Sequence, residues 1–528
     1  MKKRILFTAI CLVLPALFFG AAGQEAMRDF RFVTDTNPYI TLGNPAAISF
    51  WNGRIATAEV SFDKHDGGLR DIHESSDSWQ VTAGTESYCR ISDLIAFHGQ
   101  LAWSDFSGKA MGGPIMIDPS YNPVSFYEST EETLGTKQRE MYSLCGEIAL
   151  NLGDRWGIGL GVNYQAGDQT KIKDPRFSNI WMDLQTSAGV TFRATDILTL
   201  GTSLLWRNTL ENVKGHIYGT TDTQYFIYTD RGCFLGTVAD LKGDYAYIPD
   251  TNLRPMNNDW WGASLQAVIA KTFSNEFSIL RRAGYYGKKS SSTPTFFEFG
   301  GIKAEYKGLL TLPSGNNLHR GSVNLGYETL SNSENLFRYS TPEGGNTVVE
   351  YTGQNPVSSR KSLCAALDWR WYGGIRDGRA ATMIGFRGGW TSTKQTTVVY
   401  PFWRIQAINK ADAELFFQKN IFAGSNIITA DISAYGLYGY GDKDFSGEYV
   451  TPAATTLLSF DNYLDKHYEA ETAPRAGASL GFTYTRIIGK SFAPWIKIAD
   501  SFTSLVREPE FIEGRIRNIA TVSIGCNF

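Results

Sequence analysis

Segments with a period of two recur along this chain from Ile55 to the carboxyl terminus. In one of them Ile158, Leu160 and Val162 alternate with glycines. Successive side chains of a β-strand point to opposite faces, so such a segment forms a strand with one apolar face and one small or polar face. Because the pattern covers most of the chain, it restricts the protein to an all-β sandwich or barrel.

Four further segments alternate in the same way. Their apolar members are Tyr142, Leu144, Ile148 and Leu150; Ala188, Val190 and Phe192; Leu363, Ala365, Leu367, Trp369 and Trp371; and Ala476, Ala478, Leu480, Phe482 and Tyr484. The residues between them are small, polar or charged. An apolar face toward lipid and a polar face toward a lumen is typical of a transmembrane barrel.

The connections between these segments separate a barrel from a sandwich. Short turns at 152–154 and 194–196 alternate with long polar stretches at 104–140, 207–259, 331–360 and 441–473. A sandwich would have more even spacing, whereas short turns at one end and long loops at the other are typical of outer-membrane barrels. Tryptophans at segment ends agree with an interfacial aromatic belt, although scattered core aromatics would leave a similar pattern; they are Trp103, Trp156, Trp206, Trp371 and Trp390.

We therefore predict an all-β fold, a transmembrane antiparallel β-barrel over residues 55–528. Single-chain bacterial barrels have an even number of strands, so we expect 14–18 strands, with 16 as the best value. No second domain, linker or internal repeat beyond the hairpin rhythm is visible.

The amino terminus has the pattern of a cleaved secretory signal peptide. Lys2, Lys3 and Arg4 precede an apolar run, and small residues end at Gly23, where we expect cleavage. Removing the signal takes the formal charge from −3 to −6, so nucleic acid is not an expected partner. Five scattered cysteines remain, which form neither a disulfide framework nor a zinc site. Export agrees with an outer-membrane location in a Gram-negative bacterium.

The last segment of the chain, 515–528, also alternates and ends on an aromatic residue. Its apolar face consists of Ala520, Val522, Ile524, Cys526 and Phe528. Taken alone this could be a sandwich strand. In a barrel it would be the final strand, and we expect it to serve as the insertion signal through which the barrel-assembly machinery acts.

Residues 24–54 do not alternate, and we predict that they form a plug inside the barrel. Asn44 can cap a short helix, Pro45 suits its first position, and Ala46 and Ala47 allow close approach to a wall. A plain Asn-Pro turn is the alternative. Here the chain resembles the long-chain fatty-acid outer-membrane transporter superfamily and its secretion-associated relatives, which carry an Asn-Pro-Ala motif in an amino-terminal hatch. The resemblance implies that Asn44, Pro45 and Ala46 form this hatch. Beyond it the chain looks closer to an uncharacterised family of Gram-negative outer-membrane barrels.

Charged residues on the polar face should line the lumen, because charges at membrane depth face water or each other. The candidates are Glu147, Arg193, Lys303, Glu305, Asp368, Arg370 and Arg475. They could form a hydrated pore or cross-lumen ion pairs that close it.

No catalytic motif is convincing, and we expect neither an enzyme nor a cofactor. His319 and Ser322 would face opposite sides of a strand. His65 and His73 could clamp a metal but fit solvated loop residues better. Asp442, Asp444, Ser446 and Glu448 could gather oxygens around calcium, yet the calcium-loop pattern fails at Ala453, so a solvated acidic turn is favoured and no metal site is expected.

Three functions remain open. The resemblance implies passive uptake of a small hydrophobic molecule, gated by Asn44 to Ala47. A non-transporting scaffold would bind a partner protein at the outer membrane through the long loops. An open diffusion porin is the third possibility.

Overall fold

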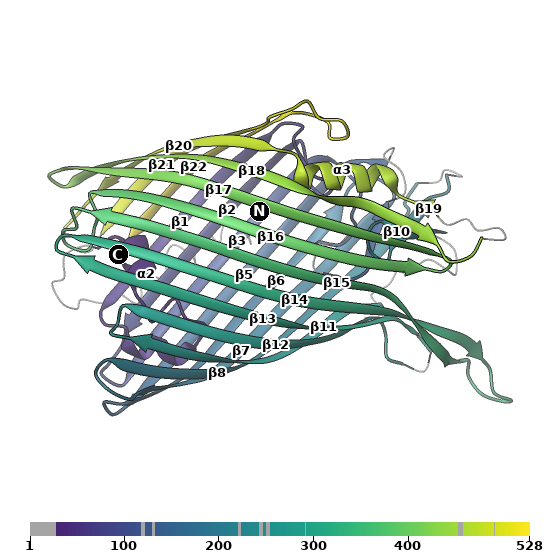
Figure 1. Cartoon of the computed structure of the whole chain (residues 1–528), viewed down its shortest axis with the longest axis horizontal. Helices are drawn as coiled ribbons and strands as arrows, with labels where there is room; N and C mark the ends of the chain where they lie inside the picture. The colour runs from purple at the N-terminus through teal and green to yellow at the C-terminus, as the bar shows by residue number, and fades with distance from the viewer. Residues whose placement is uncertain are drawn as a thin grey trace.

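The computed structural model describes residues 28–117, 122–128, 133–219, 223–241, 247–249, 254–290, 292–451, 458–489 and 492–528, so the predicted signal peptide lies outside the described residues. A sheet of 18 antiparallel strands closes on itself as a barrel (Figure 1). The fold class is thus as predicted, but our best value of 16 strands is wrong. Strand number is hard to read from the sequence where outward residues are small, as Thr85 and Ser87 of β2 are, because the apolar alternation is faint there.

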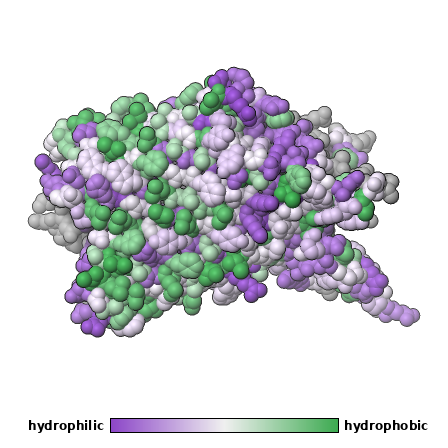
Figure 2. All heavy atoms as spheres, in the orientation of Figure 1, coloured by the Kyte–Doolittle hydropathy of each residue, from purple (hydrophilic) through white to green (hydrophobic). Residues whose placement is uncertain are grey.

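All barrel strands pair with their neighbours along the chain. They are β1 (Arg54–Asp66), β2 (Asp77–Arg90), β3 (Ile95–Met111), β5 (Gly135–Leu152), β6 (Trp156–Lys171), β7 (Arg176–Arg193), β8 (Leu198–His216), β11 (Met256–Ile269), β12 (Phe273–Gly287), β13 (Thr295–Ser314), β14 (Asn317–Ser340), β15 (Val348–Gly373), β16 (Thr382–Val399), β17 (Phe402–Ala423), β18 (Asn426–Glu448), β20 (Arg475–Arg486), β21 (Ala493–Leu505) and β22 (Ile516–Asn527). Large apolar side chains are exposed on the outer face, and Figure 2 shows them gathered over the part of the wall near the short turns.

The first and last strands form the seam of the barrel. β22 pairs with β1 so that Ile524 lies opposite Val60 and Val522 opposite Phe62, all on the outer face. Phe528 continues the pairing beyond the strand, because its amide donates to the carbonyl of Ala56 at 2.8 Å. The alternating carboxyl-terminal segment is therefore a wall strand, and without it the ring would stay open.

Several stretches that we predicted as loops are strands in part. β3 and β5 extend into 104–140, β8 and β11 into 207–259, and β18 into 441–473. The stretch 331–360 is almost entirely strand, because β14 and β15 continue as a two-stranded ribbon that projects beyond the barrel wall at the right of Figure 1. Polar residues dominate this stretch, and the exposed apolar ones, such as Leu336 and Tyr339, are isolated among them. The regular apolar alternation of a membrane strand is therefore missing although the backbone pairing continues.

The long loops also fold into a separate structure that we call the outer cap. It consists of a four-stranded sheet in the order β19 (Leu458–Ser459), β10 (Leu235–Asp240), β9 (Phe226–Asp230) and β4 (Ser125–Glu128), with helix α3 (Asp461–Thr472) beside it. Phe126 and Ile227 of the cap pack against the inward-facing Tyr286 and Phe297 of the wall. The cap therefore fills the lumen at the long-loop end.

The N-terminal segment, residues 28–53, lies inside the opposite end of the barrel (Figure 1). It contains helix α2 (Phe30–Thr36) and the 3-10 helix η1 (Pro45–Phe50), and η1 contacts β3, β5, β6 and β7. Among the described residues, no helix has both the length and the apolar character needed to cross a membrane.

Candidate functional site

The amide of Asn44 joins the N-terminal segment to three wall strands. Its Nδ2 donates to the Gln266 side-chain oxygen at 2.9 Å and to the carbonyl oxygens of Val190 and Thr202 at 3.1 and 3.3 Å. Its Oδ1 accepts from the backbone N–H of Ala46 at 2.9 Å and so caps η1, as the sequence predicts. Only 2% of Asn44 is exposed, so all of these bonds are made away from solvent.

Inward-facing glycines form the surface on which Asn44 and η1 rest. A Cβ on Gly159 would overlap the backbone nitrogen of Ala46, and a Cβ on Gly189 would overlap the Asn44 oxygen. Gly157 allows the same close approach to Ser49. We call Gly157, Gly159 and Gly189 the glycine seat. Ala46 and Ala47 are fully buried, because only residues without larger side chains fit between the two backbones.

Charged wall residues contact the rest of the segment. The carboxylate of Glu276 accepts from the Gly43 amide at 2.6 Å. Arg370 donates to the Asp35 carboxylate at 2.6 Å, and Arg320 donates to the Asp35 backbone carbonyl at 2.8 Å. The segment is therefore held at both its helices and at the turn between them.

Two polar chambers remain in the lumen beside this segment. One has a volume of about 520 Å³ and adjoins Gly43. Its charged lining residues are Arg207, Glu276, Lys303, Glu305, Lys307, Glu328 and Arg360. The other has a volume of about 770 Å³ and adjoins α2, with Arg370, Arg387, Glu414, Asp431 and Lys497 in its wall. Both chambers carry charges of both signs, which suits a polar solute better than an apolar one.

Buried ion pairs fasten the outer cap to the wall. Glu128 of β4 pairs with Lys171 of β6, and both side chains are 1% exposed. Beside them, Lys137 donates to the carbonyl oxygen of Pro114 at 2.6 Å. Between β9 and β10, Arg231 makes two parallel bonds to the Glu334 carboxylate of β14, at 2.7 and 3.0 Å. Such bidentate pairs are geometrically specific, so they fix the position of the cap as well as its attachment.

The pKa values of Asp230 and His467 in the cap, and of Asp71 in the connection between β1 and β2, depart from their ordinary range. Burial raises the pKa of the Asp230 carboxyl to about 7, although its Oδ1 accepts from the Gly232 amide at 2.8 Å. Burial opposes the charge on His467, but the Asp71 carboxylate 2.9 Å away outweighs it and raises the pKa of His467. Burial likewise opposes the charge on Asp71, yet His467 lowers the pKa of that carboxyl. The His467 to Asp71 contact therefore ties α3 to the connection between β1 and β2 as an ion pair.

The predicted lumenal residues all lie on the inner face, but the structure does not gather them into one cluster. Glu147 lies 2.9 Å from His98, Lys303 pairs with Glu305 at 2.9 Å, and Asp368 pairs with Arg370 at 2.9 Å. Arg193 stacks over the Phe50 ring of η1 at 5.4 Å. Arg475 begins β20, opposite Leu437 and Leu505.

The structure does not bring together the residues that we considered as weaker catalytic or metal-binding candidates. His319 and Ser322 of β14 face opposite sides of the wall, with His319 beside Trp369. His65 lies beside Arg517 and His73 beside Asp71. The favoured acidic turn is wrong, because Asp442, Asp444, Ser446 and Glu448 belong to β18 and Ser446 accepts from Arg404. Across the described residues, no group of three or more acidic, cysteine or histidine side chains could hold a metal ion.

Sequence reasoning missed the partners of the N-terminal segment. The glycine seat was visible as small residues alternating along β6 and β7, but the pattern did not show what rests on it. The sequence pattern did not single out Gln266, Glu276 or Arg320. A polar residue on a lumenal face produces the same alternation whether its side chain contacts water or a plug. The cap was missed for a similar reason, since its core residues come from separate loops.

A closed, even-stranded antiparallel barrel with an apolar outer face is the architecture of an outer-membrane β-barrel. Similar solved structures include the ferric preacinetobactin receptor BauA of Acinetobacter baumannii, with a TM-score of 0.39 and 6% identity over 90% of this chain and 80% of that one. A Pseudomonas aeruginosa FadL homologue has a TM-score of 0.30 and 12% identity over 93% and 94%. Pseudomonas aeruginosa OccK8 (OprE) has a TM-score of 0.30 and 9% identity over 90% and 98%. No curated protein matches the sequence. Residues 45–528 match the family of unknown function DUF6850, and the chain belongs to that family.

Proposed function

We propose that this protein is a passive outer-membrane transporter whose lumen is closed at rest and whose gate is the N-terminal segment around Asn44 to Ala47. The observation that carries the proposal is the docking of Asn44 on the glycine seat. The contacts of Asn44 are neutral hydrogen bonds, each worth about 0.5–1.5 kcal/mol net, so breaking them leaves no charge unpaired. The charged contacts of the segment, Glu276 with Gly43 and Arg370 with Asp35, border the two polar chambers, where other charged groups and solvent can replace them.

The charged chambers favour a small polar or zwitterionic solute over the hydrophobic molecule that the resemblance implies. Arg207 pairs with Asp183 at 2.6 Å, and Lys303 pairs with Glu305 at 2.9 Å. A zwitterion can exchange its own charges with such pairs, whereas an apolar solute would leave them desolvated. Because Gly43 bonds to Glu276 in the same chamber, a bound solute that competes for this carboxylate would also weaken the seat.

Single-channel conductance in planar bilayers tests the proposal with four proteins. The first is the wild type. The second is Gly189→Ala, whose added Cβ displaces Asn44, and the third is Glu128→Gln, which removes the ion pair between the cap and the wall. The fourth combines both substitutions. If the two closures act in series, the wild type and both single variants stay silent or flicker briefly, and the double variant conducts steadily.

The control replaces Gly189→Ala with Gly146→Ala, where an added Cβ meets no atom within 4 Å. Heat-dependent mobility on a detergent gel checks that each barrel has folded. A silent double variant that is folded would overturn the transporter proposal. Steady conductance of the wild type would favour the open porin instead.

A partner-binding scaffold is the second candidate, and the β14 to β15 ribbon favours it. Pairing with β13 stops at Glu334 and pairing with β16 stops at Ser358, so the ribbon beyond lacks a strand on either outer edge in the described part of the chain. Leu336, Tyr339 and Tyr351 are exposed on it. Deleting 338–350 should abolish stoichiometric recovery of a partner from cross-linked outer membranes. Recovery of no partner with the intact ribbon would count against the scaffold.

We further propose that β22 is the strand that the barrel-assembly machinery recognises, because its outer face ends on Phe528 at the seam. Replacing Phe528 with Asn should slow assembly without changing the stability of barrels that do form. Unchanged assembly kinetics would remove this role.

A further inference from the structure

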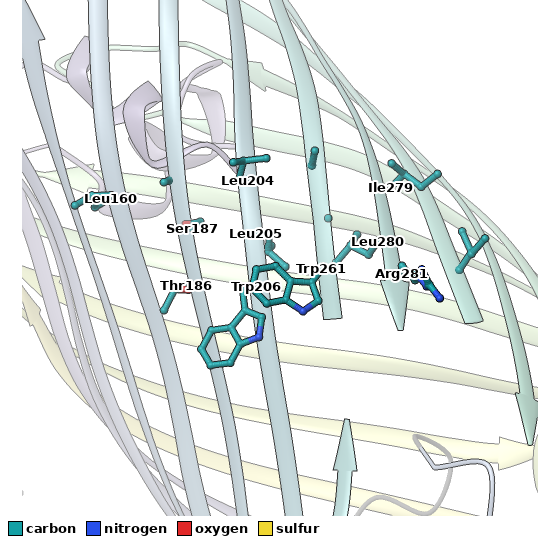
Figure 3. Close-up of a pocket in the computed structure, with 14 residues that line it drawn as sticks. Leu160, Thr186, Ser187, Leu204, Leu205, Trp206, Trp261, Ile279, Leu280 and Arg281 are labelled. Atoms are coloured by element: carbon teal, nitrogen blue, oxygen red, sulfur yellow. The ribbon is translucent and has the colours of Figure 1, made fainter. Parts of the chain in front are cut away.

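Two adjoining hollows lie on the outer face of the barrel, where the wall meets lipid. One has a volume of about 730 Å³ and the other about 470 Å³, and Leu160, Ala188 and Leu204 line both. Figure 3 shows the larger hollow, which spans from β6 across β8 and β11 to β13. We call this feature the wall groove and define it by Leu160, Ala188, Leu204, Trp206, Trp261 and Ala263.

Alternating side-chain size produces the groove. Along one hydrogen-bonded row of the sheet, Leu160 lies opposite Ala188, Ala188 opposite Leu204, and Leu204 opposite Ala263. Leu204 is 67% exposed and therefore projects from the wall, whereas each alanine leaves a space beside it. The groove is lined almost wholly by apolar atoms, so a hydrocarbon chain would replace lipid contacts that the small residues cannot make.

A tryptophan pair and an arginine end the groove on the long-loop side. Trp206 lies opposite Trp261, with ring centroids 6.0 Å apart, and Trp261 lies opposite Arg281 (Figure 3). In the next outward-facing row, Asn208 donates to the Asp259 carboxylate at 2.9 Å, so the wall becomes polar there. The tryptophans thus lie where the apolar belt gives way to headgroups, the position that aromatic girdles take in such barrels.

Arg281 is exposed on this outer face, and no ion pair or hydrogen bond joins its guanidinium to another side chain in the described ranges. A cation on the lipid-facing side is unfavourable unless an anion is near. A guanidinium matches phosphate geometry and can bind it with two parallel bonds.

We propose that the wall groove is a specific lipid site, in which an acyl chain fills the hollows and the phosphate of the same lipid contacts Arg281. The occupant is a phosphorylated, acylated lipid of the leaflet on the long-loop side, because Arg281 and the tryptophans lie at that boundary of the apolar belt. The site is independent of the transporter proposal, since it uses the opposite face of the wall.

Native mass spectrometry of the full-length, detergent-solubilised barrel with added phosphatidylglycerol tests the site. The wild type should retain one lipid more tightly than any further ones. Arg281→Gln should weaken the binding of that lipid about tenfold, as expected for the loss of one charge-assisted contact. The double variant Ala188→Leu and Ala263→Leu should weaken it by a similar factor, because leucines fill the hollows.

Two matched controls lie on the same outer face away from the groove. Lys361→Gln removes an exposed outward charge on β15, and Ala478→Leu fills an outward position on β20. Neither should change retention, and heat-dependent mobility confirms folding of every variant. Equal losses in the controls, or no loss in the groove variants, would overturn the proposal. Equal retention of phosphatidylglycerol and diacylglycerol would also overturn it, since the phosphate contact would then contribute nothing.

Discussion

The two structures that close this lumen are held by different chemistry. The outer cap is fastened by buried ion pairs, with Glu128 on Lys171 and Arg231 on Glu334. The N-terminal segment rests on glycines and is held there by the neutral amide of Asn44, while its charged contacts, Glu276 with Gly43 and Arg370 with Asp35, lie beside the polar chambers. Breaking a buried ion pair leaves a charge without a partner, whereas breaking a neutral bond leaves groups that water can satisfy once the segment moves. The difference teaches that the N-terminal segment is suited to ready, reversible release, whereas the cap is the more persistent of the two closures and opens only when buried charges are separated or neutralised.

The largest effect should come from the cap. Glu128→Gln leaves the buried Lys171 without its carboxylate and should lower the free energy of local cap unfolding by about 3–5 kcal/mol. Hydrogen exchange of residues 223–241, read by mass spectrometry, measures this. Asp77→Asn, at an exposed ion pair with Lys109, should leave exchange unchanged. A Glu128→Gln cap as protected as the wild type would show that the pair does not fasten it.

A smaller effect is expected at the N-terminal segment. Asn44→Ala removes the helix cap and three wall bonds and should lower the free energy of release by about 2–3 kcal/mol. Asn44→Ser keeps an acceptor for the Ala46 amide and should lose about half as much. Exchange of residues 44–50 measures both. If Asn44→Ala lowered the free energy of segment release by more than Glu128→Gln lowers that of cap unfolding, the N-terminal segment would be the more firmly held of the two closures.

The pH should act on the cap through Asp230. Its pKa is raised to about 7, so the protonated carboxyl stabilises the cap; this contribution is complete below pH 3.8 and is lost as the pH rises through about 7. His467, whose pKa is also raised, acts in the same direction, while the lowered pKa of Asp71 matters only in acid. Cap exchange, corrected for its intrinsic rate, should be on the order of a hundredfold faster at pH 8 than at pH 5, because about two pK units of stabilisation are lost between them. Asp230→Asn should remove most of that dependence, and an unchanged dependence would exclude Asp230 as its source.

The smallest effect should be that of Arg31→Ala. Arg31 is 77% exposed and lies 3.6 Å from Glu59, so the pair should contribute less than about 1 kcal/mol. Exchange of α2 measures it. A loss comparable to that of Asn44→Ala would mean that even an exposed ion pair contributes strongly to holding the N-terminal segment, and the contrast with the cap would narrow.

The alternation of side chains predicted the parts of the molecule that depend on local geometry. Ile158 and Leu160 face outward, Asp368 and Arg370 face inward, and Asn44 caps a short helix, because strand periodicity and capping act over a few residues. Contacts between distant segments were not predictable in this way. Glu276 meets Gly43 across more than two hundred residues, and nothing in the local sequence of either marks the other.

The strand number and the cap escaped prediction for related reasons. A strand is counted by its apolar outer face, and small outward residues such as Thr85 weaken that signal. The cap core joins Tyr127, Tyr228 and Leu464 from three loops, where no period relates one residue to the next. In both cases the missing information lies in pairing between segments rather than within them.

The seam between β1 and β22 has a consequence for the order of assembly. The N-terminal segment leads directly into β1 at Arg54, and the ring closes when β22 pairs with that strand. Unpaired strand edges cannot be satisfied by lipid, so a spanning barrel exists only once this last pairing is complete. The N-terminal segment is joined to β1 and lies inside the ring, so the most direct route is for it to enter the lumen before β22 pairs with β1. The act that seals the wall against the membrane would then also enclose the segment.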